Sequence, residues 1–166
     1  NGPLAGGGVN VTGAATIEQG AQLAARLSGS VAAGDQFVVL TSADSVTGTY
    51  TLLNGGQVTA FLSVNAIYDP DQVTLVVNMA MDFADAGLTR NQIATAGGLQ
   101  SLGAGNPLYD IILNIPTADQ ARNAFDQLSG EVHASVRGAM LDDSRFPREA
   151  ALNRLRSAMG GVGASR

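Results

Sequence analysis

The stretch 60-AFLSVNAIYDPDQVTLVVN-78 contains two apolar runs with a turn signal between them. In the second run, Val73, Leu75 and Val77 point one way and the residues between them the other. This period of two predicts a half-buried β-strand. Asp69-Pro70-Asp71 predicts the turn, because proline fixes φ and aspartate side chains bond to nearby backbone. The stretch therefore predicts two strands joined by a tight turn.

Similar short runs occupy the chain up to residue 80, separated by glycine, asparagine and aspartate. In 36-QFVVL-40 both faces are apolar, which suits a strand that is buried on both sides. Short strands between glycine-rich turns are typical of a sandwich, a barrel or a β-solenoid. The small residues and very short runs of 1-NGPLAGGGVNVTGAATIEQGAQL-23 favour the solenoid, in which each coil buries its face against the next. We expect residues 1–80 to form one β-rich domain.

Residues 86–160 have the pattern of a small antiparallel helical array, which we expect to form a second domain. Two capping boxes start helices, one from Thr89 to Gln92 and one from Thr117 to Gln120. Apolar residues then recur at helical spacing, and Pro147 is expected to start a further helix. The predicted stripes are Ile93, Ala96 and Leu99; Ala121, Ala124, Phe125 and Leu128; Val132, Val136, Ala139 and Met140; and Leu152, Leu155 and Met159.

Charge and composition limit the class of protein. Up to Asp85, seven acids face a single arginine, giving −6; beyond it seven acids face eight arginines, giving +1. The overall net charge of −5 argues against a nucleic-acid partner, whose backbone attracts basic patches. No run approaches the roughly 18 apolar residues that cross a bilayer, so no direct membrane span is expected. The 166-residue chain, without cysteine or lysine, is typical of a piece of a longer protein.

The stretch 126-DQLSGEVHASVRG-138 carries the single histidine of the chain. Glu131 and His133 are two residues apart and face different sides of one helix, so they cannot share a metal ion or a proton. We interpret the stretch as a structural joint in which Ser129 caps a helix and Gly130 allows close packing. No nucleophile elbow or phosphate-loop pattern occurs. The expected catalytic, cofactor-binding and metal-binding residues are therefore none.

Two surface features leave alternatives open. Asp142 and Asp143, with Asp110 or Glu149, could hold a cation, although a solvated helix end is the favoured interpretation. The stripe of Leu152, Leu155 and Met159 is either core or a surface that contacts a partner.

The order of the segments resembles one protein family. The runs 34-GDQFVVLTSADSVTGTYTLL-53 and 67-IYDPDQVTLVV-77 are similar to the end of the β-helical passenger in autotransporters (type V secretion). Leu88-Thr89-x-Asn91-Gln92 resembles the helix start that follows in those proteins. The segment from Ala124 to Ser135 resembles their A-L-x-Q-L-S-G-E-[IV]-x-A-S joint, and the segment from Arg145 to Leu155 resembles their last turns before the membrane β-barrel. Pro147 departs from the family, which usually continues one helix there.

The resemblance implies the end of a right-handed β-solenoid (β-helix) with a hairpin-like cap, followed by the helical array. It implies a non-catalytic secretion and folding module that nucleates passenger folding at the bacterial cell surface. The implied partners are the upstream passenger, the downstream β-barrel, which is absent from this chain, and the outer-membrane assembly machinery. The cap core is expected to comprise Phe37, Val39, Leu40, Tyr50, Leu52, Ile67, Tyr68, Val73, Leu75 and Val77.

Two other classes of function are weighed against this one. The alternative is a surface adhesion module of a secreted bacterial protein, whose β-face binds a host protein or glycan. An enzyme has almost no support within these residues, and any activity of the parent protein is expected upstream of Asn1. No cofactor is expected.

Overall fold

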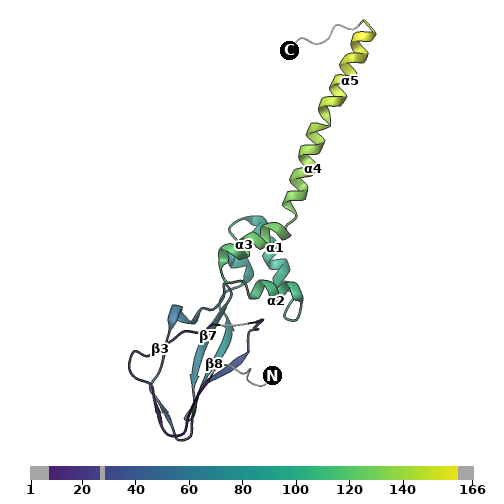
Figure 1. Ribbon diagram of the computed structural model, residues 1–166. Coiled ribbons are helices and arrows are strands. Elements are labelled where there is room, and N and C mark those ends of the chain that lie inside the picture. The colour runs from purple at the N-terminus through teal and green to yellow at the C-terminus, as the bar shows by residue number, and fades with distance from the viewer. Residues whose placement is uncertain (1–7, 27–28, 161–166) are drawn as a thin grey trace. The chain divides into compact units, whose positions relative to one another are not determined.

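The computed structural model describes residues 8–26 and 29–160, apart from the side chains of residues 131–134. The chain divides into two compact units, Asn1–Leu128 and Ser129–Arg166. Strands occupy the first part of the chain and helices the rest (Figure 1), which confirms the predicted order of β followed by α.

The described β-part comprises short strands, as the glycine-rich punctuation predicts, and two 3-10 turns. The strands are β1 (Val9–Val11), β2 (Ala15–Thr16), β3 (Gln22–Leu23), β4 (Gln36–Ser42), β5 (Val46–Thr47), β6 (Thr51–Leu52), β7 (Leu62–Tyr68) and β8 (Gln72–Met79). The 3-10 turns are η1 (Leu53–Gly56) and η2 (Phe83–Ala86).

The first six strands form three parallel pairs. We call β1, β2 and β3 the outer strand set and β4, β5 and β6 the inner strand set. β1 pairs with β4, β2 with β5 and β3 with β6, so the chain passes the same three places twice in the same order. Val9 lies opposite Leu40, 31 residues later, and Gln22 lies opposite Thr51, 29 residues later. On the exposed side, the Thr47 hydroxyl donates to Thr16 Oγ1 at 3.3 Å.

The two longest strand pairs are antiparallel. The four-stranded sheet has the order β1-β4-β8-β7, with β8 antiparallel to both β4 and β7. The predicted turn at residues 69–71 joins β7 to β8, and the Asp69 backbone N–H donates to the Gln72 carbonyl at 2.9 Å. The hairpin predicted from the opening stretch is therefore present.

Three helices complete the first unit: α1 (Arg90–Ser101), α2 (Pro107–Leu113) and α3 (Ala118–Leu128). The capping box that begins α1 is confirmed: Thr89 Oγ1 accepts from the Gln92 N–H, and the Gln92 side chain accepts from the Thr89 N–H, both at 3.2 Å. Thr117 Oγ1 accepts from the Gln120 N–H at 3.4 Å, which is one half of the second predicted box. Local sequence thus places both helix starts.

The sheet and the three helices share one hydrophobic core. Phe61 directly before β7, Phe83 in η2 and Phe125 in α3 are fully buried in the same cluster. The Phe61 and Phe83 rings lie with their centroids 4.6 Å apart. This common core explains why the structure divides after Leu128, although the charge pattern changes near Asp85. Charged side chains lie at the surface, whereas the extent of a compact unit depends on which elements share a buried core.

The second unit comprises α4 (Glu131–Asp143) and α5 (Arg145–Ala158), which run nearly in line with each other (Figure 1). Pro147 lies in the first turn of α5, so the predicted new helix begins two residues before the proline. Every described side chain from residue 135 to 160 is exposed. Across the described part of the chain, no helix combines the length and apolar character needed to cross a membrane.

Candidate functional site

The predicted cap residues fall into three groups. Leu40, Val73, Leu75 and Val77 are buried, with at most 5% of their surface exposed. Ile67 is 49% exposed, so its prediction as a core residue is wrong. It shares the outward face of β7 with Ser63 and Asn65, because side chains alternate along a strand. The half-buried members, which pack against the core, are Phe37, Val39, Tyr50, Leu52 and Tyr68.

These residues belong to two clusters. Leu75 and Val77 belong to the common core that also holds the helices, and Phe37 and Leu52 pack against it. Leu40 and Val73 form a smaller cluster with Ala15 in β2 and Ile17, which follows β2. Val39 packs against both clusters. The β8 hairpin strand therefore connects the helical end of the unit to the paired strand sets.

The hairpin covers one edge of β4 in the inner strand set and bonds to single residues next to it. β8 pairs with β4 along its length, and the turn then supplies carbonyl groups: Asp71 accepts from the Ser42 N–H and Pro70 from the Val46 N–H, both at 2.7 Å. The Tyr68 hydroxyl accepts from the Tyr50 N–H at 2.7 Å. These three backbone N–H groups, which could otherwise pair with a further strand, are thus hydrogen-bonded within the unit.

The outer strand set has no second strand neighbour among the described residues, and neither have β5 and β6; within the six paired strands only β4 has one, β8. Among the described residues, β1, β2 and β3 each pair with one strand, and each lies at the edge of its sheet. Val9 in β1 is 59% exposed. An edge strand carries backbone groups that can pair with a further chain. The hairpin therefore covers the second edge of β4 and bonds to Val46 and Tyr50, whereas each of the three outer strands keeps an edge without a strand partner among the described residues.

Close stacking of the two strand sets depends on Gly48, which follows β5. A Cβ atom at this position would lie 2.1 Å from the Ile17 carbonyl oxygen, far inside van der Waals contact. Its φ is +87°, a conformation that L-residues rarely adopt. Gly48 thus allows the chain after β5 to approach the backbone of Ile17, directly after β2.

Gly48→Ala is expected to detach the outer strand set while the hairpin stays folded. The backbone conformation alone costs about 1–3 kcal/mol for a residue with Cβ, and the contact with Ile17 forces the strands apart. Gly20→Ala is a matched control, since Gly20 has φ +84° but nothing within 4 Å of its Cβ position. Hydrogen exchange of residues 9–23 measures the difference; equal exchange in the two variants would contradict the role assigned to the contact.

Several residues that organise the site carry no strong local signal. Phe61 and Phe83 centre the common core, and Val31, in the connection from β3 to β4, is buried with 4% exposed. Thr59 donates to the Leu113 carbonyl at 3.0 Å. Asn114 bonds to Val31 across 83 residues of sequence. Burial of a lone phenylalanine could have been guessed from its size, but the polar contacts depend on elements that are distant in sequence.

The joint after α3 differs from its prediction. The residue before α4 is Gly130, in the left-handed conformation with φ +70° and without a side-chain capping bond, so Ser129 is not the cap of that helix. A Cβ atom at Gly130 would meet nothing within 4 Å, so the glycine serves the positive φ and not close packing. The side chains of Glu131 and His133 lie outside the described residues.

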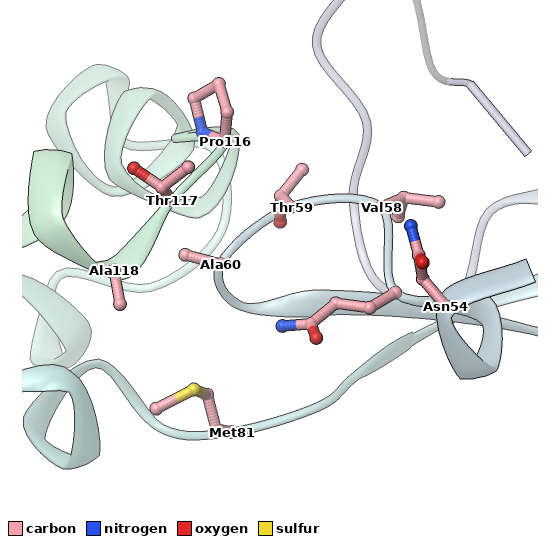
Figure 2. A pocket seen from close by; sticks show the side chains of 9 residues that line it. Asn54, Val58, Thr59, Ala60, Met81, Pro116, Thr117 and Ala118 are labelled. Carbon is pink, nitrogen blue, oxygen red and sulfur yellow. The ribbon is translucent and has the colours of Figure 1, made fainter.

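A hollow of about 540 Å³ lies between the chain before β7 and the chain before α3. Figure 2 shows its walls, with Thr59 and Ala60 on one segment, Thr117 and Ala118 on another, and Met81 on a third. Amide, hydroxyl and apolar groups line it, and none of the lining side chains ionises near neutral pH. No group of three or more His, Cys, Asp or Glu side chains suited to a metal occurs in the described residues.

Comparison with known proteins links the chain to secreted bacterial proteases. An extracellular serine protease of Serratia marcescens is 25% identical over 199 aligned positions, which cover 95% of this chain and 18% of that protein. A second match to an extracellular serine protease of the same organism is 42% identical over 60 residues, 36% of this chain and 6% of that protein. The chain is therefore distantly homologous to part of a secreted bacterial protein and spans under a fifth of its length. No family model and no solved structure matches.

Proposed function

We propose that residues 8–79 form the last two coils of a right-handed parallel β-solenoid, with the β7–β8 hairpin as their cap. The observation that carries the proposal is the repeated parallel pairing of β1 with β4, β2 with β5 and β3 with β6, at separations of 31, 31 and 29 residues. A chain that passes three faces in the same order and stacks on itself is the defining geometry of a solenoid.

The unit serves as the folding nucleus of a longer autotransporter passenger. A solenoid coil is stabilised mainly by its neighbour, so coils need a formed end on which to stack. The hairpin turn covers the inner set through Asp71 and Pro70, while the outer set offers three edges in parallel orientation. Because β8 already occupies the second edge of β4, a further coil can pair along all three strands only on the outer set, which supports growth from that side. The free energy gained as each coil stacks would then bias the upstream chain toward the cell surface.

The second unit links the passenger to the outer-membrane translocator. Helices α4 and α5 expose large apolar side chains that water solvates poorly, which supports contact with a further part of the protein. Their most exposed members are Met140, Leu141, Phe146, Leu155 and Met159. The relatives are described as extracellular, which is consistent with a protein exported across the outer membrane.

This role requires no catalysis by the chain itself. The hollow at Thr59 and Thr117 is lined by amides, hydroxyls and apolar groups, which hold chain segments together but do not transfer protons at neutral pH. The relatives are named serine proteases. On this proposal any such activity of the parent protein resides in a part outside this chain.

Deletion of residues 36–78 from the longer protein is expected to abolish surface display of its passenger. An epitope tag upstream of residue 1, detected on intact cells, measures display. The control is insertion of the membrane part, which is measured by the resistance of that part to unfolding in detergent extracts. Insertion is expected to persist. Retained display together with lost binding to host cells would contradict nucleation and favour the adhesion module.

A further inference from the structure

The side-chain amide of Asn114 substitutes for a strand neighbour of Val31. Its Oδ1 accepts from the Val31 N–H at 3.1 Å, and its Nδ2 donates to the Val31 carbonyl at 3.1 Å. A backbone partner in a sheet would offer the same donor and acceptor. Val31 lies in the connection that carries the chain from β3 to β4, and its side chain is buried in the common core.

The position of Asn114 depends on the docking of α2. It ends that helix, and its Nδ2 also donates to the Asp110 carbonyl at 2.8 Å within the last turn. The neighbouring Ile112 and Leu113 are buried in the common core. The next residue, Ile115, accepts from the Ala60 N–H at 2.9 Å beside β7. The amide therefore reaches Val31 only when the helical array is packed on the sheet.

The connection has a second anchor on the hairpin. The Gly34 N–H donates to the Val77 carbonyl at 2.8 Å, and the Val77 N–H donates to the Asp35 carbonyl at 2.9 Å. This anchor fixes the end of the connection next to β4. Asn114 fixes the part nearer to β3, so it holds the segment from which the outer strand set departs.

We propose that Asn114 is a positioning residue that makes the outer strand set form only after helices α1–α3 have docked. The outer strands are very short, with three, two and two residues paired. Strands of this length are marginal without support from neighbouring elements. The clamp on Val31 supplies that support by tethering the chain between the two sets.

The biological meaning of this coupling rests on the proposed function. The edges that would receive an upstream coil belong to the outer strand set, whereas the clamp belongs to the helical array. The folding nucleus then includes both the β-strands and helices α1–α3. Its outer strand set, on which an upstream coil would stack, forms last. Helices α1–α3 are part of the folding device in addition to joining it to the second unit.

Hydrogen exchange on the 166-residue chain tests the coupling with Asn114→Ala. Amides in residues 9–23 and the Val31 amide are expected to exchange about tenfold faster, because two bonds that hold the connection are lost. Amides that pair β7 with β8 are expected to stay within about twofold of the parent chain. Asn106→Ala is the matched control: it removes the capping bond to the Leu108 N–H at the other end of α2 and touches neither strand set.

Acceleration of all amides by the same factor in Asn114→Ala would overturn the proposal, since Asn114 would then support only global stability. The same would follow if Asn106→Ala loosened residues 9–23 equally. If Asn114→Ala does not fold, Asn114→Asp replaces it. This variant keeps the acceptor for the Val31 N–H and loses the donor to the Val31 carbonyl. The Val31 amide should then lose less protection from exchange than the amides of the outer strand set. These outcomes are independent of export, so a failure of nucleation in cells leaves the exchange result standing, and the reverse.

Discussion

Phe83→Ala is expected to lower the free energy of unfolding of the first unit by about 3–5 kcal/mol. Phe83 is fully buried in η2, between β8 and α1. Its ring centroid lies 4.6 Å from that of Phe61 and 5.0 Å from that of Tyr109 in α2. Truncation removes apolar contacts to the sheet and to the helices at once, and it leaves a cavity in the middle of the core.

Urea unfolding followed by tyrosine fluorescence measures this effect, since the chain has three tyrosines and no tryptophan. Phe146→Ala is the control, because Phe146 in α5 is 64% exposed and the same truncation there should change stability by less than about 0.5 kcal/mol. Exchange of amides in β8 and α1 should accelerate together in Phe83→Ala. Loss of the helices with an intact hairpin would show that the shared core is not cooperative.

Leu75→Asp is expected to destabilise the unit by about 4 kcal/mol or more. Leu75 is 5% exposed and pairs with Phe37 of β4 on one side and Ala66 of β7 on the other. A carboxylate there would lie in the common core without a charged partner, so the chain must leave it buried at high cost or open the sheet. In the longer protein, the proposed nucleation predicts that passenger display falls while the membrane part still inserts.

Ile67→Asp is the matched control for this substitution. Ile67 lies on the adjacent strand β7, is 49% exposed and packs in neither core cluster. We expect a change in stability below about 1 kcal/mol and normal display. If Leu75→Asp destabilises the isolated chain as expected and the passenger is still displayed normally, the nucleation proposal is contradicted. Equal loss of display in both variants would point to a charge effect during translocation instead.

The predictions that held depend on local chemistry. The turn at residues 69–71 follows from proline and aspartate, and the start of α1 follows from Thr89 and Gln92, whose partners lie three residues apart. The alternation of Val73, Leu75 and Val77 predicts their burial. Each of these features is determined by residues that are close neighbours in sequence.

The predictions that failed required knowledge of distant partners. An apolar residue in a predicted strand is expected to face the core, yet Ile67 lies on the outward face of an edge strand. Ser129 has a residue type suited to a helix cap, but the left-handed conformation of Gly130 takes that position before α4. In both cases the local preference was compatible with the predicted arrangement and with a second one, and the packing of the whole unit selected the second.

By itself, the sequence determined the order of β followed by α, the hairpin turn and the capped helix starts, because these depend on backbone preferences and contacts within a few residues. Only the tertiary structure decided that the sheet and helices α1–α3 share one core, and that Asn114 holds Val31 across 83 residues. Contacts over such separations cost loop-closure entropy, which is repaid only when many of them form together. No single segment contains that information, so cooperative packing sets the boundary of the unit at Leu128.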